Sequence, residues 1–511
     1  LAEGDAPGAR DALQVLGTSE DMAVDAINDA LFDLMGDTTI EYGHPAPSSS
    51  RIIAKTWRNS LPMTDQITTA PRVPKRVAAV ILNSLKGGVV PRIGLPYITV
   101  GREFEIQALL TDLSLISDGG ASFRFLVGRY GAGKSFLLQT IRTHAMGEGF
   151  VVADADLSPE RRLQGGQGQG LATYRELVRN LSTKTRPEGG ALNLILDRWV
   201  QNLEAEDASR EDMSKGDVSN GHVAGSTPAG TSIRAQFAAI EEMVHGYEFS
   251  RVLGIYRNAV STGDEETKAL AVKWLRGEYR TKTEARSELG VTAIIDDDTW
   301  YDYVKLLARF LTGAGYKGLL VLIDELVNLY KIPNAVTRQY NYEKILQMYN
   351  DTLQGKAHHL GIIMGGTPTS IEDRRRGVFS YEALRSRLTQ GRFAREGMRD
   401  MLAPIIRLQP LTYEELLVLI EKIAQIHAGY FGYTCTLRDA DLVEFLTIEF
   451  GRVGAETHLT PREVIRDFIE LLDIMCQNPN TDLHELMASG TVGVADASAP
   501  SNTTPFAEFT I

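Results

Sequence analysis

Cysteine is scarce in this sequence: Cys435 and Cys476 are the two present among 511 residues. Two cysteines provide neither a disulfide framework nor a metal-binding cluster, so a reducing, cytoplasmic location is favoured over secretion. Apolar runs long enough to cross a bilayer are lacking as well, and the N-terminus has no signal-peptide pattern, so no membrane partner is expected. Basic residues are outnumbered by acidic ones, 53 to 66, which gives a net charge of −13. This charge disfavours a surface that coats nucleic acid, although it allows a local basic patch.

A glycine-rich loop is the most informative stretch that is present. Residues 128–135 read Gly-Arg-Tyr-Gly-Ala-Gly-Lys-Ser, with an apolar, strand-like run before them and a helix-like run after them. Glycines at this spacing let the loop curl and aim backbone N–H groups at a phosphate, and the dipole of the following helix favours the anion. This is the phosphate-binding P-loop pattern, in which Lys134 reaches the β and γ phosphates and Ser135 ligates Mg²⁺. The predicted nucleotide contacts are Gly128, Arg129, Tyr130, Gly131, Ala132, Gly133, Lys134 and Ser135.

An acidic pair follows another strand pattern. Residues 318–323 read Gly-Leu-Leu-Val-Leu-Ile, typical of a strand buried on both faces of a parallel sheet, and Asp324 and Glu325 come next. Ligands bind at the carboxyl ends of such strands. We predict that Asp324 helps to hold Mg²⁺ and that Glu325 takes a proton from the attacking water; the alternative is an ordinary surface carboxylate pair. The guanine-binding pattern Asn-Lys-x-Asp does not occur in the sequence, so the expected cofactors are ATP and Mg²⁺.

Further positions are candidates for sensing or stabilising the γ-phosphate. A third apolar strand, residues 360–364, ends near Thr367, which either orients the attacking water or forms a Thr-Pro turn. Residues 371–399 hold eight arginines. Among them, Arg385 and Arg387 lie where rings of AAA+ ATPases project an arginine finger into the neighbouring subunit, which implies self-association. The alternatives are that these arginines face solvent or bind a nucleic-acid backbone, so DNA is a candidate partner.

Two more arginines stand at the start of predicted helices. Gly101-Arg102-Glu103 resembles the segment of origin-recognition-type AAA+ ATPases that wraps the adenine, so Arg102 is a candidate nucleotide contact. A capped surface helix is the alternative. Thr460-Pro461-Arg462-Glu463 is a capping box with proline at the first helical position. It places Arg462 where AAA+ proteins carry their second sensor arginine, unless Arg462 is an ordinary exposed residue.

The order of these motifs predicts an α/β fold of AAA+ type: a P-loop core with a parallel sheet, a large helical insertion and a C-terminal helical lid. We expect a helical appendage at residues 1–74, the core at 75–405 and the lid at 406–486. The insertion spans about 158–310, because a compact core needs far less chain between its two nucleotide motifs. Within it, the polar residues 205–232 predict a surface loop, and residues 487–511 predict a disordered tail.

Several stretches together resemble the P-loop ATP-binding proteins of bacterial phage-exclusion (BREX-type, BrxD-like) defence loci. Beyond the glycine-rich loop they are residues 171–177, 318–326, 341–343, 365–368 and 380–388, and the resemblance covers about residues 75–485. It implies an ATPase similar to AAA+ proteins of the origin-recognition class and encoded beside a large helicase, so a helicase or another defence-complex protein is an implied partner. Residues 26–42 resemble the C-terminal module of tellurite-resistance TerB proteins.

The sequence leads to two expectations for function. The first is an enzyme that hydrolyses ATP and cycles between ATP- and ADP-bound shapes to drive or gate an antiviral defence complex acting on DNA. The second is a signalling scaffold that stays loaded with nucleotide, hydrolyses little of it and recruits an effector. Intact nucleotide motifs serve both functions, so a measurement of turnover is needed to separate them.

Overall fold

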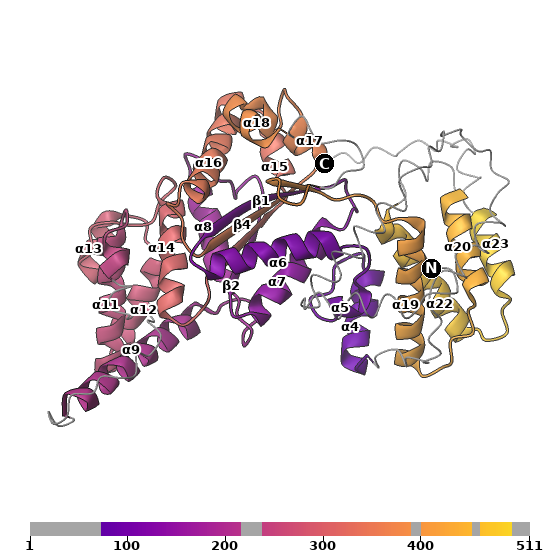
Figure 1. The fold of residues 1–511 in the computed structure, drawn as a ribbon, viewed down its shortest axis with the longest axis horizontal. Helices are drawn as coiled ribbons and strands as arrows, with labels where there is room; N and C mark the ends of the chain where they lie inside the picture. The colour runs from indigo at the N-terminus through magenta and orange to yellow at the C-terminus, as the bar shows by residue number, and fades with distance from the viewer. Residues whose placement is uncertain (1–72, 216–237, 390–399, 452–459, 493–511) are drawn as a thin grey trace, which may run out of the picture. The chain divides into compact units, whose positions relative to one another are not determined.

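A five-stranded parallel sheet lies at the centre of the fold (Figure 1). The computed structural model describes residues 73–215, 238–389, 400–451 and 460–492. The strands are β1 (Ala121–Val127), β2 (Val151–Asp156), β3 (Leu319–Asp324), β4 (Leu360–Gly366) and β5 (Ile405–Arg407). They lie in the order β2-β3-β4-β1-β5, and each strand pairs in parallel with its neighbours. The predicted α/β fold class with a parallel sheet is therefore confirmed.

Helices cover both faces of this sheet, which is why β3 is apolar along its length. One face packs against α6 (Glu103–Ser117) and α7 (Lys134–Gly147). The other face packs against α8 (Gln169–Arg179), α14 (Trp300–Gly313) and α16 (Ala335–Leu353). A strand between two helical layers has no solvent side, so polar residues enter β3 only at its end.

Helices also build the long insertion between β2 and β3. They are α8, α9 (Leu192–Lys215), α11 (Gly246–Thr262), α12 (Glu265–Leu275), α13 (Lys282–Leu289) and α14. Their core is aromatic, with Trp199 edge-on to Phe310 and Trp274 edge-on to Tyr303. The loop predicted at residues 205–232 is wrong at its start, because α9 continues to Lys215. Glutamate and alanine there are good helix formers, so a stretch of low hydrophobicity continued the helix. Residues 216–237 lie outside the described part.

Shorter helices follow β3 and β4. They are α15 (Val327–Tyr330) before α16, and α17 (Pro368–Glu372), a 3₁₀ turn at Val378–Ser380 and α18 (Glu382–Leu388) after β4. The chain then returns to the sheet as β5, beside β1. The core boundary predicted at residue 405 therefore falls inside a strand of the sheet, which runs to Arg407.

We use the name lid for the helices of the predicted lid region: α19 (Tyr413–Phe431), α20 (Asp439–Gly451), α22 (Pro461–Gln477) and α23 (Leu483–Val492). Capping boxes at Thr412 and Thr460 start α19 and α22, and the second of them was predicted from the sequence. Two helices that we assigned to the core, α4 (Lys75–Lys86) and α5 (Leu95–Ile98), share the hydrophobic cluster of the lid through Ala78, Ile81, Leu82 and Ile98.

The ends of the described chain limit two of the domain predictions. The tail predicted from residue 487 starts inside α23, which runs to Val492. Residues 493–511 lie outside the described part, as does the predicted appendage at 1–74 apart from Val73 and Pro74. Within the described residues, no helix combines the length and the hydrophobicity needed to cross a membrane.

A cluster of polar side chains links α4 to the lid, and we expect it to make the stability of the protein depend on pH. Asp473 of α22 accepts hydrogen bonds from Lys86 and pairs with the buried His427. Burial raises the pKa of Asp473, but the bonds to Lys86 and His427 outweigh it, so the pKa lies below its ordinary value. A depressed carboxylate pKa contributes stability above the unfolded pKa and loses it as pH falls through the folded pKa. Asp473→Asn should therefore lower the melting temperature at neutral pH, and the gap to the unmodified protein should close in acid; a gap independent of pH would contradict this.

Candidate nucleotide-binding site

The glycine-rich loop 128–135 joins β1 to α7 at the carboxyl end of the sheet. Gly131 and Gly133 adopt φ of 80° and 85°, a left-handed conformation that glycine takes without steric cost. A Cβ at Gly131 would also collide with Thr460, which caps the lid helix α22. The loop therefore needs glycine at 131 both for its own curl and for its close approach to the lid.

Lys134 occupies the first position of α7 and turns back into the loop. Its Nζ donates to the carbonyls of Gly128 at 3.0 Å and Arg129 at 3.1 Å. Burial lowers the pKa of Lys134, while the nearby carboxylates of Asp324 and Glu325 act in the opposite direction. The lysine cation is thus held between the loop and the acidic end of β3.

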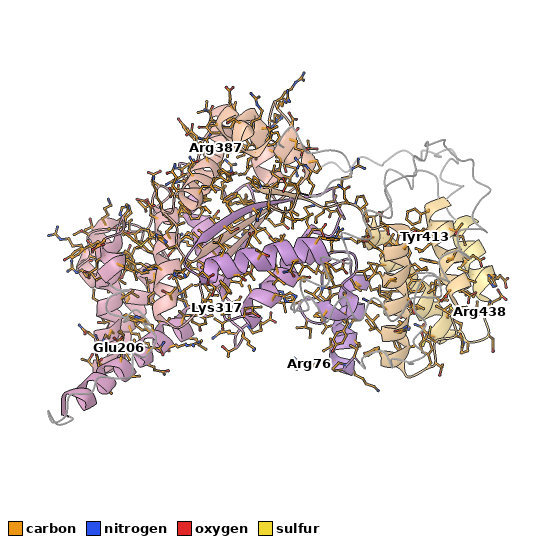
Figure 2. All side chains as sticks on the ribbon, in the orientation of Figure 1. Arg76, Glu206, Lys317, Arg387, Tyr413 and Arg438 are labelled. Atoms are coloured by element: carbon orange, nitrogen blue, oxygen red, sulfur yellow. The ribbon has the colours of Figure 1, made fainter. Side chains whose placement is uncertain are left out.

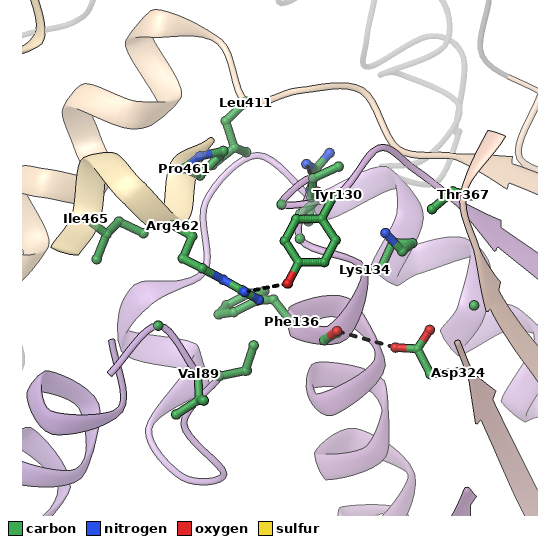
Figure 3. A pocket seen from close by; sticks show the side chains of 18 of the residues that line it. Val89, Tyr130, Lys134, Phe136, Asp324, Thr367, Leu411, Pro461, Arg462 and Ile465 are labelled. Atoms are coloured by element: carbon green, nitrogen blue, oxygen red, sulfur yellow. Dashed lines mark hydrogen bonds between the residues drawn. The ribbon is translucent and has the colours of Figure 1, made fainter. Parts of the chain in front are cut away.

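Ser135 and Asp324 bring the two sequence motifs together. Ser135 Oγ donates to Asp324 Oδ2 at 3.3 Å, although the two residues are 189 positions apart in the sequence. The contact is drawn as a dashed line in Figure 3. Parallel strands β1 and β3 flank β4, so the loop after β1 and the residue at the end of β3 meet at one edge of the sheet. A hydroxyl and a carboxylate oxygen therefore lie side by side where a divalent cation is predicted.

Glu325 leaves the sheet with an unusual backbone. Its φ is +62°, and it is one of three non-glycine residues with positive φ in the described chain. Its N–H donates to Asp324 Oδ1 at 2.8 Å. Such a conformation costs about 1 kcal/mol or more and is found often at functional sites. It directs the chain out of the strand so that Asp324 and Glu325 both line the same cavity.

That cavity has a volume of about 400 Å³ and two chemically different ends. The polar end carries the loop, Asp324, Glu325 and Lys331, and the apolar end is built from α4, α5, α7 and the lid. The apolar residues include Val89, Ile98, Phe136, Leu419 and Ile465. Sequence reasoning found the polar end but missed this wall, since its members come from four separate segments and none of them belongs to a nucleotide-binding motif.

Arg462 reaches the cavity from the lid. Its Nη1 donates to the hydroxyl of Tyr130 at 3.1 Å, and its guanidinium carbon lies 5.3 Å from the centre of the Tyr130 ring. Figure 3 shows the pair beside Lys134 and Phe136. The prediction that Arg462 opens a lid helix agrees with the start of α22 at Pro461. Its partner is a side chain of the glycine-rich loop, so lid and loop are joined at the cavity.

Arg102 is buried and bonds to the backbone. It is 5% exposed, and its Nη2 donates to the carbonyls of Ala132 at 3.0 Å and Gln409 at 2.8 Å. It thereby ties the glycine-rich loop to the segment leading into the lid. Arg102 also forms part of the cavity wall, as its predicted contact with the nucleotide requires.

Thr367 lies at the cavity, whereas the two candidate arginine fingers do not. Thr367 lines the cavity and caps α17: its hydroxyl oxygen accepts from the N–H of Ser370 at 3.2 Å, so the turn alternative describes its bonding. Arg385 and Arg387 lie on α18 and are not among the residues that line this cavity. Arg387, labelled in Figure 2, is exposed and donates to Ala383 of its own helix, while Arg385 pairs with Glu382 at 3.6 Å.

Asp156 is a third carboxylate at the same edge, and sequence reasoning gave it no role. It ends β2 in register with Asp324 on β3. Burial raises the pKa of Asp156, and the neighbouring charges of Asp324, Asp154 and Glu325 raise it further. Its position at the end of an apolar strand was a signal that could have been used, because the carboxyl ends of paired parallel strands meet.

Gly365 makes room for the Asp324 carboxylate. A Cβ at this position on β4 would overlap Asp324 Oδ1. Gly365→Ala should therefore displace the carboxylate and weaken Mg²⁺-dependent nucleotide binding by about tenfold. A titration of Mg²⁺ against a fluorescent ATP analogue measures this. Gly254→Ala, in a helix with open space around the new methyl group, is the matched control; equal affinities of both variants would contradict the assignment.

The parallel sheet, the glycine-rich loop and the acidic strand end define an α/β fold of the kind that forms the core of P-loop ATPases. The family model described as BREX system ATP-binding protein BrxC/D matches residues 73–491 of the chain. The chain therefore belongs to this family of ATP-binding proteins of the BREX phage-defence system. No curated protein has a matching sequence. The predicted family is confirmed, and with it ATP as the ligand and a role in BREX phage defence.

Proposed function

We propose that this chain is a Mg²⁺-dependent AAA+ ATPase. The observation that carries the proposal is the contact between Ser135 and Asp324, with Lys134 and Glu325 lining the same cavity. Binding of a nucleotide with Mg²⁺ uses the glycine-rich loop and Asp324, whereas a base such as Glu325 is needed only for hydrolysis. The proximity of a cation ligand and a candidate base supports hydrolysis over binding alone.

The residues at the polar end fit both ligands. Mg²⁺ prefers hydroxyl and carboxylate oxygens, which Ser135 and Asp324 supply. Bound there, the ion would neutralise charge on the phosphate oxygens. A cavity of about 400 Å³ with one polar and one apolar end suits a triphosphate joined to a base.

Each remaining side chain has a proposed role in turnover. Glu325 takes a proton from the attacking water, and Lys134 with the loop N–H groups holds the β and γ phosphates. Thr367 lies on the cavity wall where it would orient that water. Arg462 would exchange the Tyr130 hydroxyl for a phosphate oxygen, which is a stronger acceptor because it is charged.

A neighbouring subunit is proposed to complete the site. Arg387 or Arg385 is the candidate finger, because α18 places both away from the cavity of their own chain. If the finger acts in trans, Lys134→Ala and Arg387→Ala proteins should each be inactive alone and regain part of the turnover when mixed. Steady-state phosphate release from the mixture checks this, and a mixture as inactive as its parts would contradict a finger at Arg387. The same mixing with Arg385→Ala tests the other candidate.

The family supports a place for this activity in BREX phage defence. We propose further that the chain works in the cytoplasm, in a defence complex that acts on DNA with a helicase partner. Phosphate release with and without Mg²⁺ and DNA, alongside mass measurement in ATP, tests the proposal. Turnover that requires Mg²⁺ and rises with DNA is expected. Nucleotide-dependent recruitment of a partner without turnover would favour the signalling scaffold instead.

A further inference from the structure

A second cavity, of about 670 Å³, lies between α16 and α18 and opens to solvent. The two helices are neighbours at the upper edge of Figure 1. Arg338 and Gln339 of α16 form one wall, and Arg375, Ser380 and Ser386 contribute to the rest. We call this cavity the arginine groove. Its polar lining consists largely of hydrogen-bond donors.

Two guanidinium groups beside the groove share one backbone carbonyl. Arg338 Nη1 donates to Ile332 O at 2.7 Å, and Arg376 Nη2 donates to the same oxygen at 3.3 Å. Arg338 is 8% exposed, so its charge is largely removed from water. Within the described part of the chain, no carboxylate forms an ion pair with either group or with Arg375, whereas the nearby Arg385 and Arg407 have such partners. Buried charges are normally paired, because desolvation is costly.

Two carboxylates of this region, Asp373 and Glu382, already have partners. Asp373 accepts from the backbone N–H of Arg375 at 2.6 Å and from the hydroxyl of Tyr330 at 3.1 Å. The backbone bond from Arg375 is the main reason why the pKa of Asp373 lies below its ordinary value. Glu382 lies on the rim of the groove, exposed and paired with Arg385. Two guanidinium groups, those of Arg338 and Arg375, therefore line the groove, and its one lining carboxylate, Glu382, is already paired.

We propose that the arginine groove binds a phosphate group. The guanidinium fork matches two phosphate oxygens, and the serine hydroxyls and the Gln339 amide add further donors. A nucleic-acid strand and a free phosphate-bearing small molecule offer the same oxygens, so both are sources of this chemistry. The inference goes beyond ATP hydrolysis and does not depend on it.

The short segment after β3 connects the nucleotide cavity with the arginines of the groove. The carbonyl of Ile332 accepts the hydrogen bonds of Arg338 and Arg376. The residue before it, Lys331, lines the nucleotide cavity together with Leu326 and Val327. A probe that carries phosphate could therefore be taken up by either site. A test of the groove needs the first site disabled, and Lys134→Ala serves as that background.

The experiment uses the full chain carrying Lys134→Ala, with folding checked by thermal unfolding. One arm measures the fluorescence anisotropy of a labelled single-stranded oligodeoxynucleotide, and the other measures binding of inorganic pyrophosphate by calorimetry. Adding Arg375→Gln should weaken binding of the recognised probe by about tenfold. Arg338→Gln should weaken it as well, and Arg375 keeps the test valid if removal of the buried Arg338 prevents folding. Arg374→Gln is the matched control, since Arg374 is exposed beside Arg375 but does not line the groove.

The two arms identify the source of the phosphate. Oligonucleotide binding that falls with Arg375→Gln assigns the groove to a nucleic-acid strand. Pyrophosphate binding that falls with Arg375→Gln, without oligonucleotide binding, assigns it to a small molecule. Failure of the Lys134→Ala protein to bind either probe overturns the proposal, and so do equal losses for Arg374→Gln and Arg375→Gln. Lack of ATP turnover by the unmodified protein would leave this result unaffected.

Discussion

Glu325→Gln should bind ATP about as tightly as the unmodified protein and lose turnover by about 100- to 10,000-fold. The amide keeps the size of the carboxylate and its place in the cavity but has no basicity with which to accept a proton. The left-handed backbone at residue 325 fixes where this side chain leaves β3, so the substitution should not move it. Single-turnover hydrolysis of radiolabelled ATP, together with retention of unhydrolysed ATP on the protein, measures both quantities.

Glu160→Gln is the control for that experiment, because Glu160 is exposed and does not line the nucleotide cavity. Its turnover should match that of the unmodified protein. If Glu325→Gln retained full turnover, Glu325 would not be the base. Asp156 would then be the next carboxylate to substitute, because it ends the neighbouring strand.

Lys134→Ala should lose ATP affinity by about a hundredfold or more, and with it all turnover at moderate ATP concentration. The substitution removes the cation that lies between the glycine-rich loop and the acidic pair, and leaves Asp324 and Glu325 to repel the triphosphate. Equilibrium binding of a fluorescent ATP analogue in Mg²⁺ measures the loss.

Lys317→Ala is the matched control, since Lys317 is an exposed lysine before the opposite end of β3, paired with Glu148. Its affinity for the analogue should not change. Tight binding by the Lys134→Ala protein would contradict the site itself rather than the mechanism. Loss of binding in Lys134→Ala together with full turnover in Glu325→Gln would leave an ATP-binding protein whose base lies elsewhere.

Comparison of the predicted and observed sites shows which sequence signals were sufficient to locate a site residue. The loop 128–135 and the pair Asp324–Glu325 could be located from sequence, because each depends on local spacing and on an adjacent apolar strand. Thr367 was also located, but its bond to Ser370 depends on the geometry of α17. Arg102 was placed at a helix start, whereas its carbonyl partners Ala132 and Gln409 are distant in the sequence.

The fold shows the same division at a larger scale. Apolar runs identified β1, β3 and β4, and the capping box at Thr460 identified α22, since both signals act over a few residues. The short strand β5 was not predicted, because a run of three residues carries too little pattern. The packing of α4 against α19 and α22 has no local signal at all.

The sequence by itself determined the identity of the chemical groups: a phosphate loop, a hydroxyl and two carboxylates suited to Mg²⁺ and water, and a family that binds ATP. These follow from residue type and short spacing, which the backbone obeys locally. Only the tertiary structure decided that Ser135 touches Asp324, that Arg462 of the lid bonds to Tyr130, and that Arg338 and Arg376 meet at the carbonyl of Ile332. Such contacts depend on how the sheet and the helices pack, and burial, which drives that packing, is not directional.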